Sequence, residues 1–269
     1  PSSLTDFGKK LLAEDSNNPG SLGIAISDAI EMVVKSGGNA KYSLGSVLGH
    51  VLMHQTINGN EAILQMEQAG DYPDIIVGCT GGGSNLAGLM FPFLGQQLRG
   101  GQKIDIIGCE PLSCPSFTKG VYAYDHGDMA RMTPLIKMHT LGSDFLPPAN
   151  HSGGLRYHGM SYHLSHLYNL GLMRAKAYGQ KDCFEAGLIF GKNEGIIPAP
   201  EGNHAVKGAI DAALECKEKG ESKTILFNLC GHGYFDMSAY DDYLNGGMSE
   251  DHYDEESANK SLSKLPQIA

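Results

Sequence analysis

The sequence lacks long apolar runs and has few basic residues. No stretch of about 18 consecutive apolar residues occurs, and the N-terminus lacks the apolar core of a signal peptide, so nothing predicts membrane insertion or export. Lys and Arg number 20 against 30 Asp and Glu, which gives a formal net charge of −10. Such an acidic chain is a poor candidate for binding nucleic acid or an anionic membrane surface.

The cysteines lack the paired spacing of metal and redox motifs. They stand at positions 79, 109, 114, 183, 216 and 230, with no C-x-x-C, and most lie in apolar surroundings. This pattern is typical of reduced thiols in a cytosolic protein and not of a disulfide framework. We therefore expect a cytoplasmic protein.

The hydrophobic pattern predicts alternating strands and helices. Short, uniformly apolar runs that are typical of buried parallel strands occur at 74–79, 104–110 and 224–230. Helical spacing of apolar residues predicts helices at 24–35, 43–57, 85–98, 182–192 and 203–218. Strand, loop, helix and strand follow one another from 74 to 110, which predicts an α/β fold.

Two regions show little periodicity. Residues 111–181 are rich in Gly, Pro, Tyr and His, and we predict long loops with short helices that carry binding groups. The acidic tail, residues 246–269, is predicted to be partly disordered.

A glycine-rich turn, "GCTGGGSNLAG", joins the strand at 74–79 to the helix at 85–98. Backbone N–H groups and the positive end of a helix dipole meet at such a turn and favour an anion, most often phosphate. Leu86 breaks the dinucleotide pattern G-x-G-x-x-G, and no lysine completes a P-loop. A small monophosphate remains, held by backbone amides with Ser84 and Asn85. The alternative is a tight turn without a ligand.

The end of the last predicted strand, "NLCGHG", gives a second candidate. Ligands of parallel sheets bind beyond the carboxyl ends of the strands. This rule brings Cys230 to the same rim as the glycine-rich turn and Glu110. Cys230 is then either a buried structural thiol or a group that faces a cofactor ring.

Several blocks in order resemble tryptophan synthase β chains, which are fold-type II enzymes dependent on pyridoxal 5′-phosphate. Besides the glycine-rich turn they are "NPGSLGIAISDA", "KYSLGSVLGHVLMHQTINGNEA", "IIGCEP", "TLGSDFLPPANHSGGLRYHGMSYHLSHL", "NEGIIPAPEGNHA" and "NLCGHGYFD". The "GGLRYHG" segment resembles the second, TrpB-like subgroup, because the better-known β chains carry Asp at the position of Arg156. The resemblance covers about residues 17–245. It implies an open, mostly parallel sheet with helices on both faces.

The resemblance also implies site residues. The cofactor phosphate would be bound by Gly81, Gly82, Gly83, Ser84 and Asn85. Glu110 would lie beside the pyridine ring, and Glu201 would have a supporting role. Cys230 replaces a serine that usually partners the pyridine nitrogen, so the partner stays neutral but becomes a weaker hydrogen-bonding group. Arg156 would line the substrate mouth and meet a carboxylate, and a surface salt bridge is its alternative.

The implied reaction is that of a lyase in tryptophan biosynthesis: indole replaces the hydroxyl of L-serine to give L-tryptophan. An α subunit and a homodimer are the implied partners. Two alternatives stay open. One is a serine or threonine deaminase of the same fold type, and the other is an inactive fragment that binds a phosphate-bearing ligand or a partner.

One element of the family is missing from these residues. The Schiff-base lysine of fold-type II enzymes precedes the segments found here, and the context of Lys9, Lys10, Lys35 and Lys41 does not resemble it. We therefore expect the C-terminal part of a longer chain, inactive alone. Residues 1–60 would be a helical segment of an incomplete N-terminal domain, 61–245 the domain that binds the cofactor phosphate, and 246–269 the tail.

The histidines offer weaker candidates. His50 and His54 are four apart on one predicted helix, but "HVLMH" lacks the H-E-x-x-H order and is typical of a core helix, so we predict no metal. His158, His163 and His166 are either ligands or surface residues. His232 either approaches the cofactor or shapes the turn after the last strand.

Overall fold

A parallel sheet forms the centre of the chain. The computed structural model describes residues 1–250 and 252–267. Four strands pair in the order β5-β2-β1-β6, all parallel. They are β1 (Ile75–Cys79), β2 (Asp105–Pro111), β5 (Arg174–Tyr178) and β6 (Ile225–Phe227). All of β1 is buried, as a central parallel strand requires.

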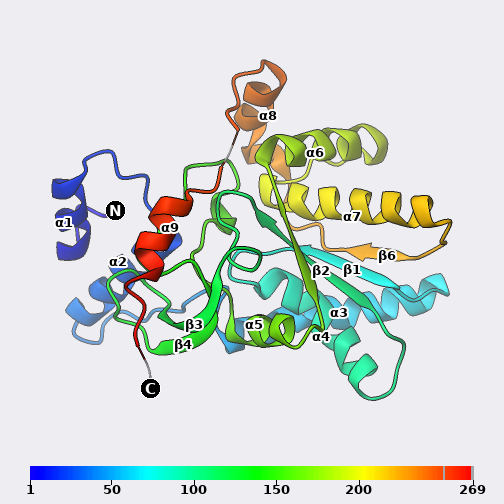
Figure 1. Ribbon diagram of the computed structural model, residues 1–269, viewed down its shortest axis with the longest axis horizontal. Helices are drawn as coiled ribbons and strands as arrows, with labels where there is room; N and C mark the ends of the chain where they lie inside the picture. The colour runs from blue at the N-terminus through cyan, green and yellow to red at the C-terminus, as the bar shows by residue number, and fades with distance from the viewer. Residues whose placement is uncertain (251, 268–269) are drawn as a thin grey trace.

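Helices cover both faces of the sheet (Figure 1). On one face lie α3 (Gly49–Ala69) and α4 (Ser84–Leu98), and on the other lie α6 (Gln180–Glu194) and α7 (Pro200–Lys219). Successive strand residues point to opposite faces. Ile76 accordingly packs with the α3 and α4 side chains, whereas Ile75 and Val77 pack with Ala212 of α7. The predicted α/β class with helices on both faces is confirmed.

The second helix begins later than the predicted range of 43–57. Helix α3 runs from Gly49 to Ala69, and the apolar residues Leu44, Val47 and Leu48 precede it and pack in a cluster with Tyr157. These residues are apolar because a tertiary contact buries them, and not because they face the core from a helix. Sequence periodicity cannot distinguish the two cases.

The middle of the chain is more regular than predicted. Strands β3 (Val121–His126) and β4 (Leu135–Thr140) form an antiparallel pair, and η1 (Gly153–Leu155) and α5 (Tyr162–Asn169) follow. The prediction of long loops with short helices was wrong for β3, β4 and β5. These strands are only partly buried and lack the uniformly apolar pattern of β1, so their residues gave no strand signal.

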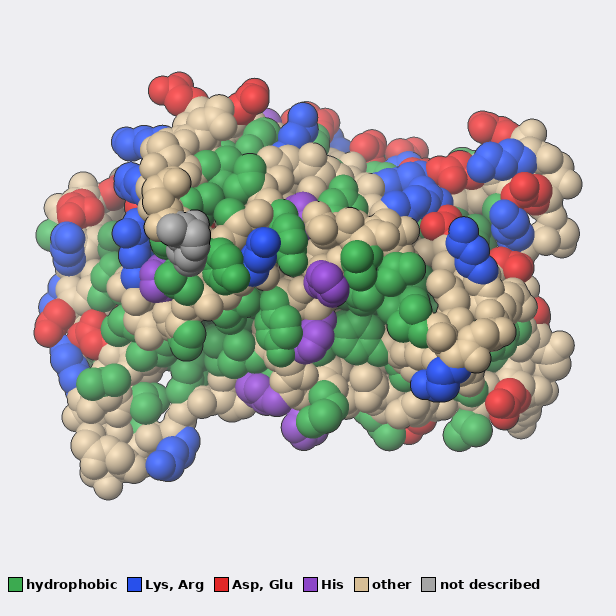
Figure 2. All heavy atoms as spheres, turned by 60° about the horizontal axis from the view of Figure 1, so that its bottom comes forward, with side chains coloured by type: hydrophobic (Ala, Val, Ile, Leu, Met, Phe, Trp, Pro, Cys, Tyr) green, Lys and Arg blue, Asp and Glu red, His purple; other side chains and the backbone are tan. Residues whose placement is uncertain are grey.

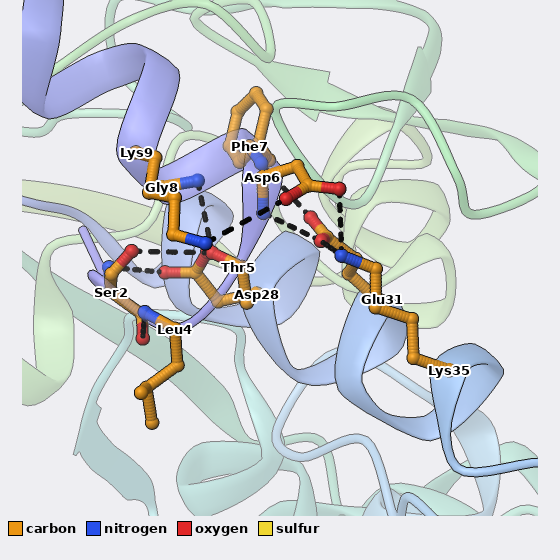
Figure 3. A network of polar contacts seen from close by, with 10 residues as sticks. All are labelled: Ser2, Leu4, Thr5, Asp6, Phe7, Gly8, Lys9, Asp28, Glu31 and Lys35. Carbon is orange, nitrogen blue, oxygen red and sulfur yellow. Dashed lines mark hydrogen bonds and ion pairs between the residues drawn. The ribbon is translucent and has the colours of Figure 1, made fainter.

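The first two helices are joined by a polar network (Figure 3). Helix α1 (Asp6–Glu14) begins with Thr5 as its cap, and α2 (Leu22–Lys35) carries Glu31. The Glu31 carboxylate accepts hydrogen bonds from the backbone N–H groups of Asp6 at 2.6 Å and Phe7 at 3.0 Å. Its hydrogen bond with Lys35, followed by these two, lowers the pKa of Glu31 to about 2. A carboxylate of α2 thus satisfies the first turn of α1.

The C-terminal region contains η2 (Gly233–Phe235), α8 (Met237–Leu244) and α9 (Glu255–Leu262). We expected partial disorder from 246 to 269, but α9 is helical because Ala258 is buried with Leu141 and Phe145. Residues 251, 268 and 269 of that prediction lie outside the described part of the chain. Within the described part, no helix has the length and apolar character needed to cross a membrane.

Candidate functional site

The glycine loop, residues 81–85, lies at the carboxyl end of β1 and opens α4. Gly83 has a φ of 104°, a left-handed conformation that favours glycine. Helix α4 then begins with no side-chain hydrogen bond at its N-cap and no acidic residue in its first turn. Its first N–H groups and the positive end of its dipole are therefore suited to an anion.

The loop has no space for side chains at its glycines. A Cβ at Gly81 would lie 2.7 Å from the carbonyl oxygen of Gly154 and 2.9 Å from Cα of Leu155. A Cβ at Gly82 would overlap Ser46, which lies just before α3. Residues 153–155, which we call the loop cover, thus press directly on the loop. The three segments can approach one another only through bare backbone.

Buried hydroxyl groups surround the loop. Ser84 is 7% exposed, and the Ser161 backbone N–H donates to the carbonyl of Gly82 at 3.0 Å. Among the described residues, the hydroxyl oxygens of Thr80 and Ser161 are buried without a hydrogen-bond partner. Unpaired buried hydroxyls are costly. Together with the uncapped helix start, they fit a phosphate group.

The end of β6 brings Cys230 to the glycine loop. Sγ of Cys230 lies 3.5 Å from Sγ of Cys79, and the Cys79 thiol in turn lies 3.7 Å from Oδ1 of Asn85. The Asn228 side chain donates to the carbonyl of Asn85 at 3.2 Å. The hydrogen bond between the thiols raises the pKa of Cys79, which burial raises further, and lowers that of Cys230. The structure therefore joins two of the predicted site segments.

Glu201 extends this group from the first turn of α7. Its Oε1 accepts a hydrogen bond of 2.9 Å from the backbone N–H of Gly154 in the loop cover. Its charge acts on both thiols, raising the pKa of Cys79 and opposing the lowering at Cys230. Sequence reasoning gave Glu201 only a supporting role. Cys79 was missed entirely, since a lone cysteine in an apolar strand carries no functional signal.

Glu110 is fully buried at the end of β2, and its carboxylate points to the following loop. It accepts hydrogen bonds from the backbone N–H groups of Phe117 and Thr118, both at 2.9 Å, and from the Thr118 hydroxyl at 2.7 Å. Burial raises its pKa to about 7. These contacts account for Glu110 as a residue that shapes residues 116–118. Its predicted place beside a cofactor ring stays a prediction.

Arg156 follows η1, and its guanidinium is bound to carbonyl groups. Nε donates to Pro148 at 2.9 Å, and Nη2 donates to Pro147 at 2.6 Å and to Gly20 at 3.1 Å. Burial lowers its pKa. Arg156 therefore ties the segment before α2 to the segment before η1. Its role toward a substrate carboxylate stays a prediction.

The histidines are spread over different surroundings. His50 and His54 are exposed on α3, so "HVLMH" is not a core segment. His158 is buried, with Nε2 2.9 Å from the carbonyl of His126, and Nδ1 of His232 accepts from the N–H of Tyr234 at 3.3 Å. No group of three or more His, Cys, Asp or Glu in residues 1–250 and 252–267 could hold a metal ion.

The face formed by α3, α4 and α5 is rich in hydrophobic side chains and histidines (Figure 2). A groove of about 520 Å³ lies between α4, α5 and the β3-β4 hairpin, and its lining includes Phe91, Tyr122, Tyr162, His163 and His166. His163 and His166 therefore belong to this groove, whereas Leu164, between them, faces the glycine loop.

Comparisons with known proteins agree with this arrangement. The family described as "Pyridoxal-phosphate dependent enzyme" matches residues 49–231. The chain is 57% identical over 253 residues to tryptophan synthase beta chain 2 of Aquifex aeolicus, covering 93% of this chain and 58% of that one. It is 55% identical over 256 residues to the same-named protein of Aeropyrum pernix, covering 95% and 57%. The chain thus spans less than two thirds of the length of these relatives.

Solved structures with the same fold include two enzymes of low sequence identity. A fungal L-serine ammonia-lyase from Rhizomucor miehei has a TM-score of 0.57 at 14% identity, covering 81% of this chain and 65% of that one. A bacterial threonine deaminase from T.th. has a TM-score of 0.53 at 16% identity, covering 76% and 61%.

The family match begins at α3 and ends just after Cys230, so it contains the glycine loop and the groups around it. The family resemblance and the cofactor predicted from the sequence are confirmed. This chain belongs to the pyridoxal-phosphate dependent enzymes, and within them it is similar to tryptophan synthase beta chains.

Proposed function

We propose that this chain is the phosphate-binding part of a lyase of tryptophan biosynthesis, in which indole replaces the hydroxyl group of L-serine to give L-tryptophan. The main support is the uncapped, buried start of α4 at three glycines that tolerate no side chain. The 57% identity to a tryptophan synthase beta chain supports this chemistry over others of the fold.

The glycine loop would hold the cofactor phosphate. Backbone N–H groups of residues 81–85 would donate to the phosphate oxygens, and the α4 dipole would stabilise their charge. The buried Ser84 hydroxyl would add a donor from the same turn. These contacts are strongest with a dianion because charge-assisted hydrogen bonds exceed neutral ones. Pyridoxal phosphate, when bound, supplies the electron sink for bond breaking at the amino-acid carbons.

Cys230 would face the ring nitrogen as a neutral group. Its sulfur is half-buried and lies on the rim beside Asn85 and Cys79. A thiol is a weak donor and carries no fixed negative charge while protonated. It would therefore leave the ring nitrogen without a proton, which suits replacement at the β-carbon. Glu201 would act by holding the loop cover in place through Gly154.

The amine that binds the cofactor aldehyde would come from outside these residues. Lys9, Lys10, Lys35 and Lys41 are all exposed, and Lys35 is engaged with Asp6 at 2.8 Å. A catalytic lysine is normally desolvated to lower its pKa. We infer that a parent chain supplies this lysine and that the 269 residues alone do not turn over serine.

L-Serine and indole are the proposed substrates, and a tryptophan synthase α subunit and a second copy of the chain are the proposed partners. A cytoplasmic location is proposed because the cysteines are present as free thiols.

The test has two stages. The purified chain is first titrated with pyridoxal phosphate, with inorganic phosphate as competitor, followed by borohydride reduction and peptide mapping. We expect saturable, phosphate-competed binding that borohydride does not fix to any one lysine. The parent enzyme is then assayed with serine and indole. Tryptophan formation supports the proposal, whereas release of pyruvate without tryptophan would identify a deaminase. Absence of saturable binding would exclude the proposed phosphate site.

A further inference from the structure

Two thiols meet at the rim of the proposed site. Cys79 ends β1, Cys230 follows β6, and their sulfur atoms are 3.5 Å apart although 151 residues separate them in sequence. Both are free thiols. A disulfide bond is about 2.05 Å long, so the sulfurs would need to approach by roughly 1.5 Å. Side-chain rotation at two strand ends is sufficient for a movement of this size.

The two sulfurs differ in access. Cys79 is 2% exposed, whereas Cys230 is half-buried. The hydrogen bond from Cys79 lowers the pKa of Cys230, and the thiolate is the form that reacts with oxidants. Cys230 is thus placed to react first, with Cys79 directly behind it. An accessible reactive thiol beside a second thiol is the arrangement of reversible redox pairs.

We propose that Cys79 and Cys230 form a dithiol that hydrogen peroxide oxidises to an intramolecular disulfide beside the glycine loop. The Cys230 sulfur attacks one peroxide oxygen, the O–O bond breaks, and a sulfenic acid forms while the other oxygen leaves as water with the thiol proton. The Cys79 sulfur then attacks the Cys230 sulfur, the S–O bond breaks, and a second water leaves with the Cys79 proton. Each sulfur loses one electron, and peroxide gains two.

The remaining cysteines provide an internal comparison. Cys109, Cys114, Cys183 and Cys216 are all buried. Burial raises the pKa of Cys109 to about 12, and the Cys114 thiol donates to the carbonyl of Tyr157 at 3.2 Å. Buried thiols of raised pKa react slowly. Oxidation should therefore be selective for the Cys79–Cys230 pair.

The disulfide would also change the proposed cofactor site, an effect that rests on the proposed function. It removes the Cys230 S–H that would face the ring nitrogen and fixes the end of β1 to the segment after β6. The loss of one hydrogen bond corresponds to a roughly fivefold rise in the Kd for pyridoxal phosphate. Reduction by dithiothreitol should restore the original value.

The experiment maps the disulfide and measures cofactor binding separately. The chain is treated with hydrogen peroxide, alkylated and digested without reductant. We expect a linked peptide pair containing Cys79 and Cys230, which is lost in Cys79→Ser and in Cys230→Ser but retained in Cys216→Ser. Sulfenic or sulfinic acid at Cys230 without the link, or links to the other cysteines in equal yield, would overturn the proposal.

Titration with pyridoxal phosphate before and after oxidation separates the two ideas. A linked peptide in a chain that does not bind the cofactor when reduced supports the dithiol and contradicts the proposed function. Cofactor binding by a chain that forms no linked peptide does the reverse. If the link forms and the Kd is unchanged, the disulfide does not act on the cofactor site, and that part of the inference is wrong.

Discussion

Glu201 accepts a hydrogen bond of 2.9 Å from the backbone N–H of Gly154 and so joins the first turn of α7 to the loop cover. The carbonyl of Gly154 in turn lies 2.7 Å from the position that a Cβ of Gly81 would occupy. Helix α7, the loop cover and the glycine loop therefore form one continuous contact. The position of the phosphate-binding loop depends on a side chain far away in the sequence.

Replacing Glu201 tests this contact. Glu201→Ala leaves the Gly154 N–H without its acceptor, and we expect a roughly fivefold loss of affinity for pyridoxal phosphate. Glu201→Gln retains a side-chain carbonyl as acceptor and should stay within about twofold of wild type, since a neutral hydrogen bond is weaker but present. The measurement is an equilibrium titration of both variants. Equal losses in the two variants would show that the charge matters and the hydrogen bond does not.

Gly81→Ala should distort the loop. Its Cβ would approach the Gly154 oxygen and Leu155 Cα within 3 Å, and overpacking against backbone costs about 1–3 kcal/mol. We expect a lower free energy of unfolding in urea and weaker phosphate binding. Gly153→Ala is the matched control, because nothing lies within 4 Å of its Cβ. A stable Gly81→Ala chain with normal binding would contradict the packing argument.

Glu110 should make stability depend on pH. Burial raises its pKa from 4.5 to about 7, so ionisation is less favourable in the folded chain than in the unfolded one. Its contribution favours folding least above pH 7 and improves as the pH falls toward 4.5. At about 1.4 kcal/mol per pKa unit, the difference is on the order of 3 kcal/mol.

Urea denaturation between about pH 5 and 8 measures this effect. In Glu110→Gln the contribution is absent, so the gap in unfolding free energy between wild type and variant should change with pH in the stated direction. Glu67→Gln, exposed at the end of α3, is the control and should leave the profile unchanged. A constant gap for Glu110→Gln would mean that the carboxyl does not titrate in this range.

Arg156→Lys should destabilise the chain despite its unchanged charge. A lysine cannot reproduce the planar arrangement that reaches the carbonyls of Pro147, Pro148 and Gly20 at once. We expect a loss of about 2 kcal/mol, because hydrogen bonds from charged donors are worth about 1.5–3 kcal/mol. Thermal denaturation beside the exposed Arg99→Lys provides the comparison. Unchanged stability with weakened serine binding in the parent enzyme would instead favour the substrate role.

The sequence determined the parts that local pattern controls. The uniformly apolar runs predicted β1 and β2 to within a residue, and helical periodicity located α4, α6 and α7. Motif order predicted the family and the cofactor. Periodicity failed where burial comes from tertiary contact. Leu44 and Val47 are apolar because they pack beside Tyr157, and the strands β3, β4 and β5 are partly buried and carry mixed side chains.

The tertiary structure decided how the site is assembled. Nothing local to Cys79 indicates that its sulfur lies 3.5 Å from that of Cys230, and nothing near Glu201 indicates that it binds the loop cover. Both contacts arise because parallel strands end at one edge of the sheet, whereas the connections that join them are long. Sequence pattern reports the surroundings of neighbouring residues. The contacts of this site join residues far apart in the chain, and only the folded sheet brings them together.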